Sequence, residues 1–402
     1  MGKQKRRVPA EEIQRPRTAE EFGDTLLAAA SETAREIRGA AKAWAKRLTP
    51  DLELPAEAAE GARRAGQHVI ARVCRGGWLP EDVDQAARRR VDEFARSFAL
   101  DTLAAYVGQF ETVHPDWRDR LREVGAGRWW TESEPHLTQW AAKHILTPAE
   151  ALTSVIEALG FLMTLPNLTR VLPPPGAATP DRPAHHAVDE KKLGRVRALL
   201  AKAESSSFPE EAEALSAKAQ ELMTRYAFDR VLVEAGEAGP EVPASRRIWL
   251  DTPYVDAKSL LVHVVAKANR CRAVFDARWD LVTVVGDEND LDSVALLTTS
   301  LLVQATRAMI ADPAGRDRAF RKSFLVSYAT RIGERLEKAA AATLTATPDP
   351  DRLLPVLASH ELKVNAAFTT LFPQVVGKSV TVRSAEGWDA GREAADRARL
   401  GD

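Results

Sequence analysis

Residues 270–286 have the sequence RCRAVFDARWDLVTVVG and decide the class of the fold, because they are the clearest β-rich stretch in a chain with a mainly helical pattern. Two β-rich runs, 270–275 and 279–285, are separated by three residues and end at Gly286. Such spacing is typical of a β-hairpin. A third β-rich run spans residues 375–383. We therefore expect a small sheet of about three strands in the C-terminal part of the chain.

Helical patterns surround these runs. We predict helices at about 255–269, 290–311, 316–343 and 386–399 from the spacing of their apolar residues. The resulting order of elements is α-β-β-α-α-β-α. Few strands among many helices imply an α+β domain with its sheet flanked by helices, and we assign that domain to residues 245–402.

The N-terminal half has no strand-like alternation and is predicted to be helical. We expect helical segments at about 21–47, 56–75, 80–110 and 148–163 within an N-terminal helical domain of residues 21–172. A further prediction concerns residues 1–20. These residues are basic, contain two prolines and have little apolar content, so we expect a disordered basic tail.

A proline-rich stretch follows the helical half. Proline can neither continue a helix nor pair inside a sheet, so residues 173–188 are predicted to be a linker between two units. Beyond it, residues 189–235 show two amphipathic helical patterns joined by a short serine turn, which predicts a central helical hairpin. Leu222 of the second helix is expected to pack against Leu199 and Leu200 of the first.

The sequence of this hairpin is similar to a known family. Residues 192–204 read KLGRVRALLAKAE, and EAEA at 211–214 and KAQELM at 218–223 follow. The combination resembles the phage and bacterial domain-of-unknown-function family numbered 2786. Residues 285–290 and 323–336 look like the domain that usually accompanies it. The surroundings of Trp78 and Trp117 are similar to the N-terminal half of actinobacterial members. The resemblance implies a related fold. It implies no activity, and no catalytic residue can be carried over from it.

The composition of the chain limits which partners it can attract and in which cellular compartment it can function. The chain has 402 residues, 45% of them hydrophobic, which suffices for two or three domains. Its net charge of -1 provides no global field that would attract nucleic acid or a membrane. Cys74 and Cys271 are far apart in sequence, which argues against a disulfide framework and a thiolate zinc site. No apolar stretch approaches roughly 18 residues. We therefore predict a cytoplasmic protein that does not bind or span a membrane.

No motif in the sequence predicts a catalytic centre, a metal site or a cofactor. Asp287, Glu288, Asp290 and Asp292 cluster after a strand-ending glycine, but helix capping explains them better than a hard cation does. Trp129-Trp130 and Trp140 are interpreted as core or interface residues. An enzyme is the less favoured class. Its best candidate is a hydrolase in which His114 and Asp116 would act as base and acid.

Arginines on an apolar helix face are the main binding signal. Projected on a helix, Arg321 and Arg335 fall in the same sector as Phe324, Tyr328 and Ile332. Such arginines pair with internal carboxylates, extend to the rim of the core, or line a groove for phosphate. The residues that we predict to bind nucleic acid are Lys191, Arg195, Lys202, Arg270, Arg272, Arg321, Arg331 and Arg335.

Three functions remain open on this basis. The first is a non-enzymatic binding module that binds DNA or RNA through local basic patches, with the N-terminal helical domain contacting another protein. The second is a protein–protein adaptor whose arginines pair with internal acids. The third is the hydrolase. A continuous positive surface would favour nucleic acid, whereas paired arginines would favour the adaptor.

Overall fold

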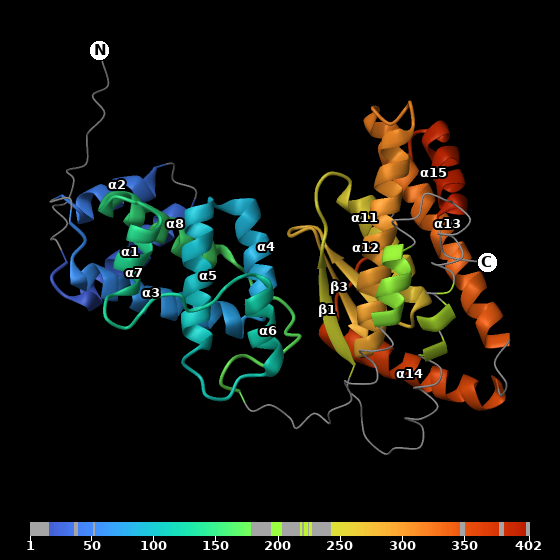
Figure 1. The fold of residues 1–402 in the computed structure, drawn as a ribbon, viewed down its shortest axis with the longest axis horizontal. Coiled ribbons are helices and arrows are strands. Elements are labelled where there is room, and N and C mark those ends of the chain that lie inside the picture. The colour runs from blue at the N-terminus through green and yellow to red at the C-terminus, as the bar shows by residue number, and fades with distance from the viewer. Residues whose placement is uncertain are drawn as a thin grey trace, which may run out of the picture. The chain divides into compact units, whose positions relative to one another are not determined.

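The computed structural model describes residues 16–35, 39–50, 53–177, 194–202, 218, 221–223, 225–226, 243–345, 350–377 and 382–398. The chain separates into two compact units, residues 1–180 and 181–402 (Figure 1). The described residues are mainly helical, and a three-stranded sheet lies in the C-terminal half, which confirms the predicted fold class. Residues 1–15 of the predicted tail, residues 178–188 of the linker and most of the hairpin lie outside the described residues.

The first unit is built from helices in its described part. They are α1 (Ala19–Ala34), α2 (Ala40–Leu48), α3 (Ala56–Arg75), α4 (Pro80–Arg90), α5 (Glu93–Val107), α6 (Pro115–Glu123), α7 (His136–Lys143) and α8 (Pro148–Thr164). Thr18 and Thr147 start α1 and α8 with capping boxes, in which Glu21 and Glu150 bind back to the cap backbone. Side chains of α1, α3, α5 and α8 pack into one core.

Two of the predicted N-terminal helices are each divided in the structure. The segment predicted as one helix over 21–47 is α1 and α2, and Gly39 takes a left-handed conformation at the start of α2. The segment predicted over 80–110 breaks between α4 and α5, where Asp92 accepts a hydrogen bond from the backbone N–H of Ala95. Apolar periodicity continues across both breaks, so the sequence pattern alone did not locate them.

The first residues of the predicted linker pack on the first unit. The indole N–H of Trp117 on α6 donates to the carbonyl of Pro173 at 2.9 Å. Pro175 is buried, and Gly176 lies so close to Phe110 that an added Cβ would come within 2.5 Å of the ring. Residues 173–177 therefore belong structurally to the helical domain, which extends beyond its predicted end at residue 172.

The second unit contains the sheet. Strands β1 (Ala244–Trp249), β2 (Arg272–Asp276) and β3 (Leu281–Gly286) are antiparallel in the order β1-β3-β2. The predicted hairpin is therefore present as β2 and β3, with Ala273 paired to Val284. Every residue of β3 is buried because helices cover both faces of the central strand.

The third strand was predicted at the wrong place. It is β1, at residues 244–249, whose sequence ASRRIW was not recognised as a strand because two arginines occupy its centre. In the predicted run 375–383, the described residues 375–377 and 382–383 belong to no strand, and Val376 is 88% exposed. These described residues pair with no described strand. Because β-forming residues are stabilised in a strand by their neighbours in the sheet, a β-rich composition alone does not produce a strand here.

Five helices in the described part of the second unit pack around the sheet or beside its covering helices. They are α11 (Val255–Ala268), α12 (Glu288–Ala311), α13 (Arg318–Thr345), α14 (Pro350–Leu371) and α15 (Ala385–Arg397). Ala273, Val282 and Val284 on one face of the sheet share a core with α11, α12 and α13. The other face meets α14, a helix that the sequence analysis missed because Pro355 lies inside it.

The described part of the hairpin joins this same core. Val196, Leu200 and Met223 are almost fully buried among the side chains of the second unit, and Leu199 and Leu222 pack against that cluster as partly buried residues. The apolar face predicted for the first helix is therefore correct. Among the described residues of the second helix, Met223 is more deeply buried than Leu222.

Among the described helices of the second unit, α13 and α15 share the most extensive contact and lie side by side (Figure 1). Gly387 and Gly391, four residues apart on α15, face the α13 backbone at Phe320 and Phe324. The hydroxyl of Ser327 on α13 also donates to the carbonyl of Trp388 at 2.5 Å. Glycine is required because a larger residue would separate the two backbones.

One described helix is long and apolar enough to cross a membrane. It is α12, and α7 with α8 would also qualify if that bent pair formed one span. Leu291, Val294, Leu297 and Leu301 of α12 are buried in the core of the second unit. A helix in the core of a globular domain can be equally long and apolar, so these two properties alone do not indicate a membrane span.

The glycine contact predicts the effect of adding a single methyl group. A Cβ on residue 391 would lie 2.3 Å from the carbonyl oxygen of Phe324, a backbone atom that cannot rotate away. Gly391→Ala should therefore lower the free energy of unfolding by about 1 to 3 kcal/mol. Gly194→Ala is the control, since its Cβ would meet nothing within 4 Å. Urea denaturation of the full chain measures both, and equal stability of the two variants would contradict the close contact.

Candidate binding surfaces

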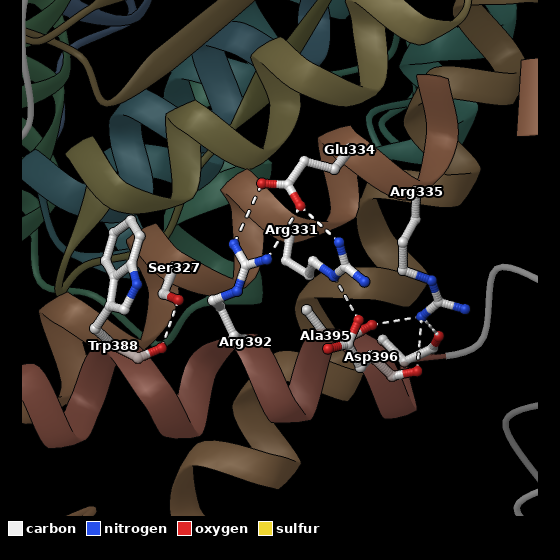
Figure 2. A network of polar contacts seen from close by, with 9 residues as sticks. Ser327, Arg331, Glu334, Arg335, Trp388, Arg392, Ala395 and Asp396 are labelled. Atoms are coloured by element: carbon white, nitrogen blue, oxygen red, sulfur yellow. Dashed lines mark hydrogen bonds and ion pairs between the residues drawn. The ribbon is translucent and has the colours of Figure 1, made fainter. Parts of the chain in front are cut away.

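Arg335 of α13 binds the C-terminal end of α15. Its guanidinium Nη1 donates to the carbonyl of Asp396 at 3.0 Å and also to the carbonyls of Ala395 and Ala398 (Figure 2). The last carbonyls of a helix have no partner within the helix and form the negative end of its dipole. Arg335 supplies both the missing donors and a positive charge. It thus caps α15 from a neighbouring helix.

Arg331 lies one turn earlier and connects two carboxylates. Its side chain pairs with Glu334 at 2.6 Å on its own helix and with Asp396 on α15 (Figure 2). Glu334 also binds Arg392 of α15 at 3.2 Å. Hydrogen bonds from Arg331 and then Arg392 lower the pKa of Glu334, so this carboxylate stays charged at neutral pH. The result is an ion-pair network across the α13–α15 contact.

Arg321 also binds within the protein. The Nε of its half-buried side chain donates to the carbonyl of Gly315, just before α13. The sequence analysis considered a carboxylate partner or an exposed rim position for Arg321 and Arg335. Both bind backbone carbonyls, which are acceptors that a sequence does not reveal.

Arg270 forms a buried ion pair at the entrance to β2. Its guanidinium donates from Nη2 and Nε to the two carboxylate oxygens of Asp290, at 2.7 and 3.2 Å. Their side chains are only 20% and 7% exposed. Burial alone would lower the pKa of Arg270, but the charge and hydrogen bonds of Asp290 outweigh it, and the pKa is raised. Such a two-point contact fixes the geometry of both side chains.

The acidic cluster after β3 pairs with bases rather than capping α12 through its side chains. Asp287 has the backbone conformation of an N-cap, but its carboxylate makes no cap hydrogen bond. It pairs instead with His360 of α14, at 3.1 Å, where both residues are buried. Asp292 pairs with Arg246 of β1 at 2.5 Å. Asp287 therefore stands at the expected N-cap, with Glu288 and Asp290 in the first turn, but without a cap hydrogen bond from its side chain. The sequence analysis did not anticipate its contact with α14.

The remaining predicted basic residues differ in exposure. Arg272 is exposed, donates to Asn365 of α14 at 2.5 Å and stacks over the ring of Phe368. Arg195 and Lys202 are exposed on the described part of the hairpin, whereas Lys191 lies outside the described residues. Among the predicted set, the structure brings Arg331 and Arg335 together on one helix. Arg270 and Arg272 lie at the start of β2.

His114 has a structural role at the start of α6. Its Nδ1 accepts a hydrogen bond from the backbone N–H of Asp116 at 3.3 Å, which caps the helix. The carboxylate of Asp116 lies 3.4 Å from the same nitrogen. A nitrogen that accepts the cap hydrogen bond cannot at the same time donate to this carboxylate. The arrangement therefore lacks the acid–base relay that the hydrolase interpretation requires.

An aromatic surface on the first unit emerges from three separate segments. Phe94 starts α5, Trp129 lies in the loop before α7, and His144 ends α7. Phe94 packs edge-on against His144 with ring centroids 5.6 Å apart, and Lys143 lies 3.9 Å above the ring of Trp129. Phe94 and Trp129 are each 37% exposed, and Ile145 is 93% exposed.

Buried polar contacts hold this surface in place. Asp101 of α5 accepts from the indole of Trp129 and contacts His136, each at 2.9 Å. Trp140 is fully buried and donates to Ser97, which in turn contacts His144 at 3.2 Å. The predicted core or interface role of the tryptophans thus separates into a core residue, Trp140, and a partly exposed one, Trp129. Spacing in the sequence did not predict their convergence.

Within the described residues, no group of three or more histidine, cysteine, aspartate and glutamate side chains is arranged to hold a metal ion. Cys74 and Cys271 are free and buried. Burial raises the pKa of the Cys74 thiol, so this group is a poor nucleophile at neutral pH.

Comparison with known proteins identifies one segment of the chain. Residues 191–230 match the model of a family described as a protein of unknown function (DUF2786). No curated protein and no solved structure matches the chain significantly. The match covers the segment that the sequence predicts to be a helical hairpin, which is a minor part of the full length. Residues 191–230 are thus similar to the domain of unknown function 2786, as the sequence of the predicted hairpin indicated.

Proposed function

We propose that the protein is a non-enzymatic protein–protein adaptor. The observation that supports this function most directly is the use of the arginines. Arg331 and Arg335, two of the residues predicted to bind nucleic acid, direct donors at Asp396, Glu334 and the end of α15. A guanidinium engaged in this way would have to break internal contacts before it could bind a phosphate.

The same reasoning applies to two further arginines of the predicted nucleic-acid surface, whereas Arg195 and Arg272 are exposed. Arg270 is held by Asp290, and Arg321 by the carbonyl of Gly315. Nucleic-acid affinity depends on basic side chains that exchange counterions for phosphates at the surface. The half-buried, internally paired arginines therefore support the adaptor, and nucleic-acid binding becomes an outcome to test.

The first unit is proposed as the interaction domain. It presents partly exposed Phe94 and Trp129 on a helical scaffold, and aromatic side chains are enriched in protein interfaces. We place the protein in the cytoplasm of a bacterium or its phage. The second unit would then be the companion of the family-2786 hairpin, and the first unit the half characteristic of actinobacterial members.

A double substitution distinguishes the two roles of the arginines. Replacing Arg331 and Arg335 with Gln should lower the free energy of unfolding by about 1 to 3 kcal/mol, mainly because the C-terminal carbonyls of α15 lose their donor. Fluorescence anisotropy with labelled DNA and RNA at about 50 mM salt should detect no binding by the wild type or by the variant. Lys338→Gln, an exposed change on the same helix, is the control for stability.

The contrary result has a clear signature. If these arginines bind phosphates, the wild type binds nucleic acid with an affinity that falls steeply with salt. The double variant then melts at the wild-type temperature and reduces the slope of log affinity against log salt by roughly two units. That outcome would replace the adaptor with a nucleic-acid-binding module.

A second experiment tests whether Arg270 serves the fold. Asp290→Leu leaves the buried guanidinium without its main partner and should destabilise the protein by about 3 to 5 kcal/mol. Adding Arg270→Met should restore much of the loss, because an apolar pair of similar size has no uncompensated charge. Thermal melts of the single and double variants measure this. A double variant as unstable as Asp290→Leu would contradict a purely structural pair.

A further inference from the structure

A proline-rich strap follows α8 on the first unit. Residues 165–177, with the sequence LPNLTRVLPPPGA, belong to no helix or strand. Leu165 has φ -67° and ψ 118°, in the extended region. Proline fixes its own φ and keeps the residue before it extended, so the consecutive prolines at 173–175 favour the polyproline II conformation. We call residues 165–177 the strap.

Two tryptophans bind the strap through its backbone carbonyls. The indole N–H of Trp78 donates to the carbonyl of Pro166 at 2.6 Å, and that of Trp117 donates to the carbonyl of Pro173 at 2.9 Å. Each tryptophan side chain is only 1% exposed. Tryptophan combines a large apolar ring with a single donor, so it packs against a neighbouring segment while its N–H fixes one carbonyl of that segment.

The start of the strap lies directly against the backbone of the unit. The N–H of Leu168 donates to the carbonyl of Gly76 at 2.7 Å. A Cβ on Gly77, which has φ 88°, would come within 2.6 Å of the carbonyl oxygen of Leu168. Glycine permits both this conformation and this close approach. Main chain therefore contacts main chain at this end of the strap.

The end of the strap forms a turn beside an aromatic ring. The N–H of Ala177 donates to the carbonyl of Pro174 at 3.1 Å. Pro175 and Gly176 occupy the centre of this turn, and Gly176 has φ 81°, which is the arrangement of a type II turn. Pro175 is buried, and Gly176 packs closely on the ring of Phe110. Both ends of the strap are thus fixed on the first unit.

The two tryptophans belong to adjoining helices of one scaffold. Trp78 precedes the start of α4 by two residues, and Trp117 lies in α6. Glu81 of α4 and Arg120 of α6, each three residues after one of the tryptophans, form an ion pair. This pair fixes the position of one indole donor relative to the other. We call Trp78, Phe110 and Trp117 the seat of the strap.

The contacts made by the seat suit a class of segment and do not depend on one particular sequence. Its hydrogen bonds end on carbonyls, which every peptide has. A polyproline II segment makes no internal hydrogen bonds, so its carbonyls are available, and it loses little conformational entropy on binding. Aromatic-lined sites bind proline-rich segments of other proteins for these reasons. A second proline-rich segment is therefore able to make the contacts of the strap.

We propose that the seat binds an extended, proline-rich segment of a partner protein, and that the strap occupies the seat when no partner is bound. The strap belongs to the same chain, so it competes at an effective concentration on the order of millimolar. It thereby inhibits the first unit internally, and a partner has to displace it. This inference rests on the proposed adaptor function and specifies the chemistry of the partner.

The test releases the strap and supplies it again as a separate peptide. Pro173→Gly, Pro174→Gly and Pro175→Gly are combined in the full-length chain, because glycine removes the ring contacts and makes the segment flexible. The probe is a labelled peptide of residues 165–177 with the wild-type sequence. Fluorescence anisotropy should show weak binding to the wild type and binding at least about tenfold tighter to the triple variant. Circular dichroism should show that both proteins remain helical.

Three controls locate the peptide on the seat. Adding Trp117→Phe to the triple variant keeps an aromatic ring but removes the donor, and should weaken peptide binding by about fivefold or more. Pro180→Gly with Pro183→Gly changes prolines beyond the strap and should leave the peptide affinity of the wild type unchanged. A peptide with alanine at each proline should bind the triple variant more weakly, because it is not preorganised.

Several results would overturn this site. An unfolded triple variant would do so, because the strap would then be an integral part of the helical core. So would no binding of the peptide to the triple variant, equal binding to the wild type, equal binding of the alanine peptide, or no effect of Trp117→Phe. A wild-type dimer that the triple variant does not form, measured by sedimentation equilibrium, would identify the occupant as the strap of a second copy. Loss of the adaptor function itself has a different signature, salt-dependent binding of DNA or RNA.

Discussion

The close contact between α13 and α15 is the constraint on which the second unit depends. Gly387 and Gly391 bring the α15 backbone against the carbonyls of Phe320 and Phe324. This separation places the end of α15 within reach of Arg335 and sets Asp396 beside Arg331. With a larger residue at either glycine, the two helices would move apart, and the same arginines would face solvent instead of a helix end. Their internal role is thus a consequence of backbone proximity.

Much of the fold could be predicted from the sequence because apolar periodicity marks the faces of helices and strands. It located the β2–β3 hairpin and the buried side of the helix containing Val196 and Leu200. It failed where pairing or tertiary contact decides the structure. The strand β1 carries two arginines and is recognisable only beside β3, and α14 contains a proline that normally argues against a helix. The break between α4 and α5 is set by Asp92, which caps the start of α5 although the apolar pattern continues across it.

The candidate sites were less predictable for a physical reason. The sequence correctly indicated that arginines on an apolar face need partners, but Arg321 and Arg335 bind backbone carbonyls, which every residue has. The contact of Phe94 with His144 and that of Lys143 with Trp129 join residues from different segments of the chain. His360 and Asp287, 73 residues apart, meet because α14 crosses the sheet.

The position of the hairpin also affects what its family match means. Val196, Leu200 and Met223 insert into a core whose other walls are α11, α12, α13 and the sheet. Residues 191–230, taken alone, would expose those apolar side chains to water. The family segment therefore supplies only part of a hydrophobic core. Its apolar positions are complementary to side chains from other parts of the chain. A chimera that transplants the hairpin would have to carry the receiving core with it.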